Sequence, residues 1–356
     1  MSGVELIREL SLAFGPSGCE DRVRELIRPR AEAVADRVAI DRMGDLIAVM
    51  SFGDKNADGR KKIMVSAHMD EVGFMVTDIR EDGMLSFGCV GGIDSSVLAG
   101  RKVFVGNEDK LISGVICSKA IHHKSAEERE TPTKARKMYI DIGVESKEKA
   151  EVQVAIGDFG TFDSEFYEFG KDGRTLKSKA LDDRMGCAAM LEMMDSLRAD
   201  PPKQNIDVYF CFTVREEIGY SGAGCVASLI CPDYALVLET TAIGDLPETE
   251  ACRRVADVGK GAVISVADRS TIYGREFVDL ALELAKENGI ASQIKRYVSG
   301  GNDAGHIHKS CEGVKTLAIS VPTRYLHSPA CVASIDDYES LRDLAQAVIR
   351  NSNKLN

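Results

Sequence analysis

The chain has 356 residues and a formal net charge of −11, and it is 44% hydrophobic and 28% charged. This length is typical of two domains, or of one large α/β domain with an insertion. The sequence has no run of 18 or more apolar residues, which excludes a membrane-spanning helix. An acidic chain without a basic block argues against nucleic acid as the main partner, which leaves small molecules, peptides and metal cations.

The amino-terminal stretch MSGVELIREL has an amphipathic helix pattern that includes acidic residues. It lacks the basic start and the apolar core of a signal peptide. Ten cysteines are scattered without a CxxC pair, and several, such as Cys187 and Cys211, lie inside apolar runs. Reduced and buried thiols are typical of this usage, so we expect a cytoplasmic protein.

The first 70 residues have an α/β pattern. Residues 4–13 and 20–36 are predicted to be helices, separated by the turn GPSGCE. The stretch VAIDRMGDLIAVM predicts a pair of strands around MGD, and KKIMVSAHMD predicts a buried strand.

The pattern changes between residues 71 and 163. Short strand-like runs separated by glycine and charged turns replace the helical periodicity, among them GFMVTDI, GMLSFGCV, RKVFVGN, KLISGVIC and KMYIDIG. This pattern predicts a small β module, a partly closed barrel inserted into the larger domain. We therefore assign residues 1–70 and 164–356 to an α/β domain and residues 71–163 to the insertion.

The α/β pattern returns after Lys179. Helical segments such as DDRMGCAAMLEMMDSL and REFVDLALELAKENG alternate with apolar strands such as NIDVYFCFTV, DYALVLE and VKTLAISVP. This alternation predicts a mostly parallel sheet that is sandwiched between helices.

Ligands bind to such a sheet outside the carboxyl ends of its strands. The residues that follow or end the predicted strands are mostly of metal-ligating types: His68, Asp70, Glu216, Glu217, Glu239 and His327. Asp182 and Asp183 open a helix after KSKAL, and helix capping accounts for only one of these two carboxylates. We expect all of these side chains to meet at one edge of the sheet.

The spacing suggests separate roles within this group. His68 and Asp70 are two residues apart on a predicted strand, so Asp70 can accept the second ring N–H of a metal-bound imidazole. Glu216 and Glu217 are adjacent and point in different directions, so one can ligate while the other acts as a base. Two histidines and several carboxylates make a nitrogen and oxygen site that suits zinc, cobalt or manganese and is large enough for two ions.

Other polar features carry weaker signals. His122 and His123 lie in a polar loop of the insertion and are predicted not to bind metal. The glycine-rich stretch SGGNDAG, before His306 and His308, predicts a cradle for a substrate or an anion, although no phosphate-binding fingerprint is present.

Five segments together resemble a known family: SAHMDEVGFMV, KALDDRMGCAAMLEMM, TVREEIGYSGA, SGGNDAGHIH and RYLHSP. The chain resembles the tetrahedral (TET) di-metal aminopeptidases, metallopeptidase family forty-two, which are labelled glutamyl, deblocking or FrvX-like aminopeptidases and sometimes endoglucanases. The resemblance covers nearly the whole chain in order. It implies a zinc-peptidase-like fold and the hydrolysis of amino-terminal residues from short peptides by a metal-activated water.

The resemblance also implies residue roles. One cation would be held by His68, Asp182 and Glu239, and the other by Asp182, Glu217 and His327, with Asp182 as the bridge. Glu216 would be the general base, Asp70 would orient His68, and Asp183 would follow Asp182 through a cis peptide bond. The glycine-rich loop, with Gly301, Asn302 and Asp303, would line the substrate pocket. Two departures stand out, because many members have Asp at position 239 and Thr at position 302.

The same resemblance implies self-association. The inserted module would be a PDZ-like barrel that makes dimers, and six dimers would build a hollow tetrahedral dodecamer that admits only unfolded peptides.

Three other functions are weighed against an aminopeptidase. A di-metal deacylase or amidohydrolase on small N-acyl compounds would use the same residues. A glycosidase would use paired carboxylates but would give His68 and His327 no role, and the chain has no Trp for a sugar platform. A non-enzymatic, metal-dependent assembly protein would leave Glu216 without a role.

Overall fold

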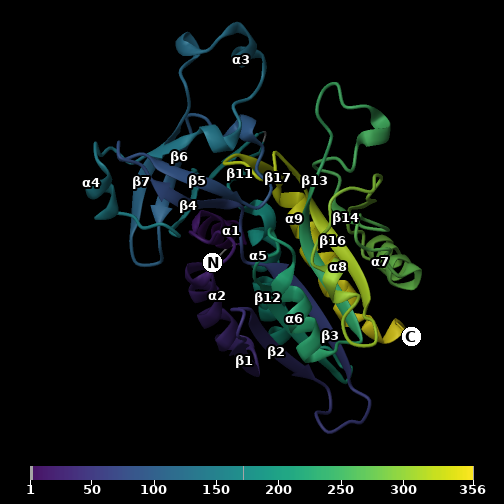
Figure 1. The fold of residues 1–356 in the computed structure, drawn as a ribbon. Helices are drawn as coiled ribbons and strands as arrows, with labels where there is room; N and C mark the ends of the chain where they lie inside the picture. Colours follow the sequence, from purple (N-terminus) through teal and green to yellow (C-terminus); the bar gives the residue numbers. More distant parts are fainter. Residues whose placement is uncertain (1–2, 171, 356) are drawn as a thin grey trace.

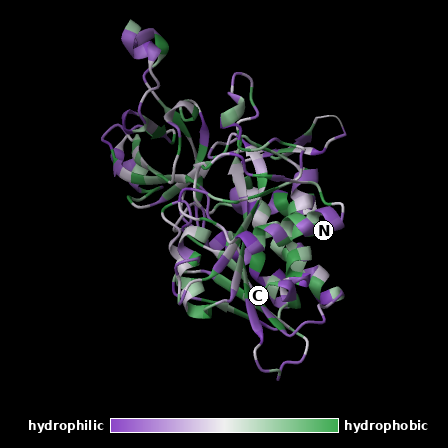
Figure 2. Ribbon diagram, turned by 90° about the vertical axis from the view of Figure 1, so that its right-hand side faces the viewer, coloured by the Kyte–Doolittle hydropathy of each residue, from purple (hydrophilic) through white to green (hydrophobic). Residues whose placement is uncertain are grey.

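The computed structural model describes residues 3–170 and 172–355. It consists of a large α/β body and a small β-barrel that projects from one end of it (Figure 1). Apolar residues gather in the interior of the body, whereas most loops are hydrophilic (Figure 2).

The body is built on an 11-stranded sheet. Its main path runs in the order β1 (Arg37–Ile40), β2 (Leu46–Phe52), β12 (Ile206–Thr213), β3 (Lys61–His68), β13 (Tyr234–Ala242), β16 (Lys315–Arg324), β17 (Cys331–Ser334), β11 (Thr175–Ser178) and β10 (Tyr167–Phe169). Two short strands, β14 (Ala262–Ile264) and β15 (Ser292–Ile294), extend it beside β16.

The four central strands, β12, β3, β13 and β16, are parallel, as the alternating pattern predicts. The outer strands β1, β2, β17, β11 and β10 pair antiparallel, and β14 is antiparallel to β16, so the whole sheet is mixed. Connections without a helix, such as the turn between β1 and β2, can only bring the next strand back antiparallel. The parallel character is therefore confined to the part of the sheet that carries long crossovers.

Strand register brings the ends of the central strands together. His68 at the end of β3 lies opposite Thr213 at the end of β12. Glu239 on β13 lies opposite Ser320 on β16. These strands are mostly buried, as their apolar runs predict, and their carboxyl ends carry the buried polar side chains of His68 and Glu239.

Helices cover the sheet. On one side α5 (Leu181–Ala199) packs against β3 and β13 and is flanked by α1 (Gly3–Leu12), α2 (Asp21–Val34) and α9 (Ile335–Arg350), with α7 (Arg275–Glu287) beside α9. The shorter helices α6 (Ser221–Ile230) and α8 (Ala304–Ile307) pack against each other in front of the strands (Figure 1). The prediction of a sheet sandwiched by helices is confirmed.

The insertion forms a closed, antiparallel six-stranded barrel. Its strands follow the order β4 (Gly73–Ile79), β5 (Leu85–Val90), β8 (Tyr139–Asp141), β7 (Leu111–Cys117), β6 (Lys102–Gly106) and β9 (Phe159–Phe162). Phe74 packs edge-to-face on Phe87 and Phe162 with ring centroids 5.3 and 5.2 Å away, in a core separate from that of the body. The inserted barrel is thus confirmed, and it is fully closed; the domain boundaries at residues 71 and 163 stay a prediction.

The connections of the barrel carry α3 (Ala126–Glu130) and α4 (Lys147–Glu151), and α3 lies on an arm that extends away from the barrel (Figures 1 and 2). Five short 3-10 turns complete the described elements: η1 (Ser95–Val97), η2 (Ile121–His123), η3 (Ala135–Lys137), η4 (Ala251–Arg253) and η5 (Ser352–Lys354). None of the helices in the described ranges is both long and apolar enough to cross a membrane.

The expectation of reduced and buried cysteines is wrong for part of the set. Cys231, just after α6, and Cys311, after α8, form a disulfide, and their Cα atoms are 5.8 Å apart. Cys89, Cys225 and Cys252 are exposed. The bonded pair is separated by 80 residues, and only the packing of α6 against α8 brings it together.

Candidate metal centre

The predicted metal-ligating residues converge at the carboxyl ends of the central strands. His68 ends β3, Glu239 lies near the end of β13, and Glu216 and Glu217 follow β12. His327 follows β16, and Asp182 and Asp183 open α5. Five elements therefore contribute to one buried polar cluster.

Asp182 lies between the two histidines. Its Oδ1 is 3.2 Å from Nε2 of His68, and its Oδ2 is 3.5 Å from Nε2 of His327. The two oxygens of one carboxylate thus face two separate imidazole nitrogens, which is the arrangement that a bridging ligand requires.

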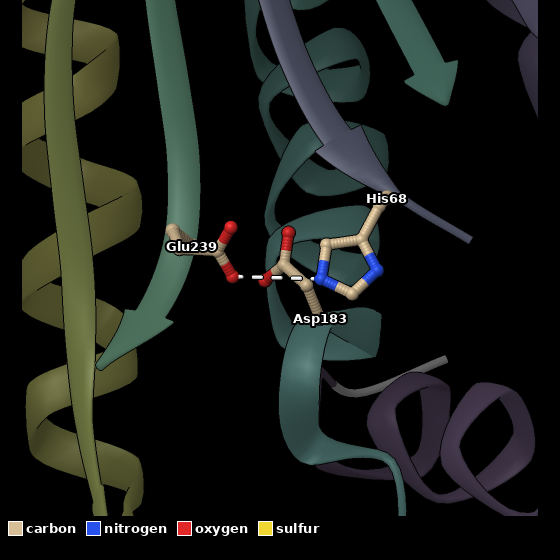
Figure 3. A group of neighbouring side chains, drawn as sticks. All are labelled: His68, Asp183 and Glu239. Atoms are coloured by element: carbon tan, nitrogen blue, oxygen red, sulfur yellow. Dashed lines mark ion pairs between the residues drawn. The ribbon is translucent and has the colours of Figure 1, made fainter. Parts of the chain in front are cut away.

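Further acidic groups complete each half of the cluster. On the first side, Oε1 of Glu239 is 3.6 Å from Nε2 of His68, and on the second, Oε2 of Glu217 is 3.3 Å from Nε2 of His327. Asp183 also points toward His68 and Glu239, with one ligand atom of each of the three within 4.8 Å of the others (Figure 3). The first half of the cluster therefore has a carboxylate beyond the three residues that the resemblance names.

Both histidines present the same nitrogen to the cluster. Nδ1 of His68 lies 3.1 Å from the Asp70 carbonyl oxygen, and Nδ1 of His327 lies 2.7 Å from the Gly92 carbonyl oxygen. A carbonyl oxygen only accepts, so Nδ1 of each ring carries a proton, and Nε2 is the nitrogen that each ring presents to the carboxylates. This is the usual orientation of metal-ligating histidine.

The start of α5 has an irregular backbone that presents both aspartates. The Asp182–Asp183 peptide bond is cis, as the resemblance implies, and Ala180 has a left-handed conformation with φ of 48°. Oδ1 of Asp183 accepts a hydrogen bond from the Gly186 amide at 3.0 Å, while its Oδ2 is buried without a hydrogen-bond partner.

Asp70 is fully buried behind His68 and connects several parts of the site. Its Oδ1 lies 3.4 Å from Nδ1 of His68 and accepts from the Glu216 amide at 3.0 Å. Its Oδ2 accepts from the Ser17 hydroxyl at 2.5 Å and the Glu217 amide at 3.1 Å. Burial would raise the pKa of Asp70, but the contact with His68 and these donors hold it below its usual range.

Dense negative charge dominates the electrostatics of the cluster. Burial and the charge of Asp182 raise the pKa of both Glu217 and Glu239 to about 8. Burial would also raise the pKa of Asp182, but hydrogen bonds to His327 and His68 outweigh it and hold that pKa low. Such crowding of buried carboxylates is costly unless cations neutralise it.

Glu216 differs from the other acids. It is 8% exposed, lies at the wall of the adjoining cavity, and belongs to neither ligand group. Burial, aided by the charge of Glu239 and opposed by His68, raises the pKa of Glu216 well above its ordinary value.

A cavity of about 400 Å³ opens beside the cluster. Gly301 and Asn302 of the glycine-rich loop line it, as the resemblance implies. Asp303 is not among the described lining residues; it is buried, and its Oδ2 accepts from the Thr213 hydroxyl at 2.7 Å.

Ser299, which begins the predicted cradle SGGNDAG, lines the cavity as well, whereas other lining residues have no counterpart in the sequence predictions, namely Tyr220, Thr240, Thr241, Lys295 and Ser320. They lie at strand ends or on loops and are not metal-ligating types, so the search for ligands passes over them.

The remaining histidines lie outside both ligand groups. His122 and His123 are on η2 of the barrel, and the ring of His306 packs edge-to-face on Tyr220 at 5.5 Å. Nδ1 of His308 donates to the Ala304 carbonyl at 2.7 Å within α8.

The donor set fits divalent cations. Two imidazoles whose Nε2 atoms face the cluster, a carboxylate between them and an unpaired buried oxygen on Asp183 make a nitrogen and oxygen site in which no thiol takes part. Zinc, cobalt and manganese accept such ligands.

Comparison with known proteins gives a consistent result. The family described as M42 glutamyl aminopeptidase matches residues 47–344. A putative aminopeptidase of Acetivibrio thermocellus is 38% identical over 94% of each chain. The lysyl aminopeptidase of Pyrococcus furiosus is 30% identical over 97% of this chain and 96% of its own.

Solved structures of peptidases are also similar to this chain in fold and sequence. The TET aminopeptidase of the marine sediment archaeon Thaumarchaeota archaeon SCGC AB-539-E09 has a TM-score of 0.92 at 34% identity, over 98% of this chain and 96% of its own. The TET1 peptidase of Pyrococcus horikoshii, described as assembling into a tetrahedron or a large octahedral shell, has a TM-score of 0.85 at 35% identity, over 98% of this chain and 99% of its own.

Proposed function

The chain belongs to the M42 glutamyl aminopeptidase family and is a metal-dependent aminopeptidase, and we propose that it removes amino-terminal residues from short peptides with two divalent cations per subunit. The observation that carries the two-cation proposal is the position of Asp182, whose two oxygens face Nε2 of His68 and Nε2 of His327. Zinc or cobalt fits this donor set best, and manganese is a further candidate.

The ligands divide into two sets. His68, Asp182 and Glu239 hold one cation, and Asp182, Glu217 and His327 hold the other. Glu239 is one methylene longer than the Asp that many members have at this position. Asp183 approaches the side of the cluster that His68 and Glu239 form, so Asp183 should be tested as an additional ligand. Bound cations would polarise the scissile carbonyl and activate a water molecule.

Glu216 is the general base and acid in this proposal. It is buried at the cavity wall, outside both ligand sets, and burial raises its pKa, which favours the uptake of a proton. Glu216 takes a proton from the attacking water and later gives it to the departing amine. Asp70 orients His68 and fixes the backbone of Glu216 and Glu217.

The relatives also motivate a proposal about assembly. Because the Pyrococcus horikoshii peptidase forms closed shells, we infer that this chain forms dimers through its barrel and a tetrahedral homododecamer from six dimers. We also propose a cytoplasmic location, since most of the cysteines are free thiols. Native mass measurement tests the assembly, and a mass that stays monomeric under all metal conditions would contradict it.

The alternatives are less well supported. The relatives from Acetivibrio thermocellus and Pyrococcus furiosus, which match along nearly the whole chain, are described as aminopeptidases, which does not favour a deacylase or amidohydrolase. A glucanase would leave the paired imidazoles of His68 and His327 without a role.

The decisive experiment separates metal binding from proton transfer. Glu216→Gln should retain two bound cations and lose turnover of aminoacyl-anilides by roughly 100- to 10,000-fold. Glu217→Gln is the matched control, since it should lose one cation as well as activity. Chelation should abolish wild-type turnover, and Zn²⁺ or Co²⁺ should restore it. Full activity of Glu216→Gln would overturn the assigned role.

A further inference from the structure

Tyr220 has an unusual backbone conformation at the edge of the metal centre. It lies between Glu217 and the start of α6, and its φ of 58° and ψ of 28° place it in the left-handed region. This region is uncommon for bulky residues, and such outliers persist where the surrounding structure enforces them, often at active sites. The strained backbone therefore points to a function of the side chain that it presents.

Two neighbours hold the side chain of Tyr220 in place. Its ring packs edge-to-face on the ring of His306, with the centroids 5.5 Å apart. Its hydroxyl oxygen lies against the glycine-rich loop, because a Cβ built on Gly301 would be only 2.8 Å from that oxygen. Glycine at position 301 thus leaves the room that the hydroxyl occupies. Tyr220 and Gly301 both line the cavity beside the metal cluster.

The hydroxyl of Tyr220 is an unused donor in this cavity. None of the described residues forms a hydrogen bond with it. Burial and the charges of Glu216 and Glu239 raise the pKa of Tyr220 to about 12, so the hydroxyl keeps its proton at neutral pH. A phenol that is protonated and unpaired can donate to a bound substrate.

A tight turn connects Tyr220 to the proposed base. The Glu216 carbonyl accepts from both the Gly219 amide and the Tyr220 amide, each at 3.0 Å. The other hydroxyl and ammonium donors among the described lining residues come from β13, from β16 and from the segment after β15, namely Thr240, Thr241, Ser320, Lys295 and Ser299. Tyr220 is therefore the donor that the turn with the base supplies.

A bound peptide would bring one acceptor next to this turn, the oxygen of its scissile carbonyl. Water that has lost a proton to Glu216 attacks the carbon of that group, so this carbon must lie beside Glu216. The oxygen becomes negative as the attack proceeds, and a donor that is already in place stabilises the developing charge. The carboxylates that hold cations only accept, so they cannot fill this role.

We propose that Tyr220 is a further catalytic residue, whose hydroxyl donates a hydrogen bond to the scissile carbonyl oxygen as that oxygen becomes negative. This inference rests on the proposed function, because the metal cluster and Glu216 fix where the attacked carbon lies. Tyr220 keeps its proton throughout, while Glu216 carries the proton of the water. The hydrogen bond is made to the reacting group and not to the first side chain, so it serves all substrates alike.

The test removes the hydroxyl alone. Tyr220→Phe should lower kcat roughly 100-fold and leave KM within about threefold, because loss of one donor to an oxyanion has an effect of this size and acts on the transition state. The loss should be the same for Leu-anilide and Ala-anilide. Metal analysis should find the cation content of the wild-type enzyme in the variant.

Two ligands separate a contact in the transition state from a structural effect. Leucine phosphonic acid has a tetrahedral, negatively charged centre, whereas 3-methylbutylamine has the same amine and side chain without that centre. Tyr220→Phe should weaken binding of the phosphonic acid by roughly the factor by which kcat falls, and binding of the amine by less than about threefold. Calorimetric titration of the metal-loaded enzymes, with displacement for the weaker ligand, measures both dissociation constants.

Tyr325→Phe is the matched control. Tyr325 is also left-handed, with φ of 58°, but it is exposed and is not among the described residues that line the cavity. Removal of its hydroxyl should leave kcat and both dissociation constants unchanged.

The outcomes separate the two levels of proposal. If the wild-type enzyme cleaves no aminoacyl-anilide in the presence of Zn²⁺ or Co²⁺, the proposed function fails and the role of Tyr220 fails with it. If the wild type is active and Tyr220→Phe has an unchanged kcat, only the role of Tyr220 fails. A loss that appears in KM or depends on the first residue would place Tyr220 in the side-chain pocket, and a loss of cations would make it a structural support. Either result also overturns the proposal.

Discussion

At the scale of single residues, Asp70 connects the parts of the metal centre that move protons and hold cations. Its two oxygens accept from the Glu216 amide, the Glu217 amide and the Ser17 hydroxyl, and Oδ1 also faces Nδ1 of His68. All of these partners are donors, so both oxygens must be acceptors.

Asp70→Asn replaces one acceptor by an N–H group that points at a donor. We expect cation affinity to fall roughly 10- to 100-fold, as with other partners of ligating histidines, and turnover to fall with it. Calorimetric titration with Zn²⁺ and turnover at saturating metal measure the two effects. Ser17→Ala removes only one of the hydrogen bonds to Asp70 and should have the smaller effect. Equal cation affinity in Asp70→Asn and wild type would refute the role of Asp70 in orienting His68.

The residue types at the metal centre could be read from the sequence because ligands follow apolar strands, and strand ends meet at one edge of a sheet. His68, Glu216 and His327 were found in this way, and Asp182 was found because two adjacent aspartates open a predicted helix. Lys295 and Tyr220 were not, because their inward direction depends on loop paths that hydrophobic periodicity does not encode.

At the scale of elements, the first turn of α5 accommodates Asp183 only because residue 186 is glycine. A Cβ built on Gly186 would lie 2.5 Å from both carboxylate oxygens of Asp183. The Gly186 amide meanwhile donates to Oδ1 of that carboxylate.

Gly186→Ala should therefore weaken the metal centre, although alanine normally stabilises a helix by roughly 0.5–1 kcal/mol relative to glycine. The methyl group must displace Asp183, so we expect fewer bound cations per subunit and lower activity. Metal analysis after gel filtration measures the loss. Asp183→Ala/Gly186→Ala should bind no fewer cations than Asp183→Ala alone, and an additional loss would place the cause elsewhere.

The disulfide joins the carboxyl end of α6 to the segment that follows α8. It closes a loop of 80 residues, and loops of this length correspond to about 4 kcal/mol of stabilisation. Cys231→Ser should lower the free energy of unfolding by an amount of this order, measured by denaturation in urea.

Cys225→Ser is the control for that measurement, since Cys225 is an exposed, unpaired cysteine on the same helix. A thiol reductant should destabilise the wild-type protein and the Cys225→Ser variant but not Cys231→Ser. If the reductant leaves the wild-type transition unchanged, the disulfide contributes no stability.

At the scale of the whole molecule, the order of the strands in the sheet differs from their order along the chain. Alternating helices and apolar strands predict the parallel centre of the sheet, and short strands with turn signals predict the barrel. The pair of β1 and β2 was predicted, but the antiparallel strands at the other edge were not, because β10, β11 and β17 pair with partners far along the chain or after non-helical connections. A hydrophobic pattern shows which face of a strand is buried, but it does not show which other strand pairs with it.

Glu71 lies where the barrel meets the α/β body. Its Oε2 accepts from the Thr161 hydroxyl of β9 at 2.8 Å, and its Oε1 is 2.6 Å from Nζ of Lys179, just before α5. The Gly15 amide also donates to Oε1, at 3.3 Å, and Arg184 is nearby. Glu71 and Lys179 are both buried, so this ion pair joins the barrel, the amino-terminal segment and the helix that carries Asp182.

Glu71→Gln would leave the ammonium of Lys179 buried without its charge partner, and loss of one partner of a buried pair costs about 3–5 kcal/mol. We expect the urea midpoint to fall accordingly and cation binding to weaken, because Lys179 lies three residues before Asp182. Adding Lys179→Met should recover part of the stability, since it removes the unpaired charge. The exposed pair of Glu145 and Lys149 gives the contrast, and Glu145→Gln should leave the midpoint unchanged. Equal midpoints for Glu71→Gln and wild type would mean that the barrel and the body are held together by apolar contacts and backbone hydrogen bonds alone.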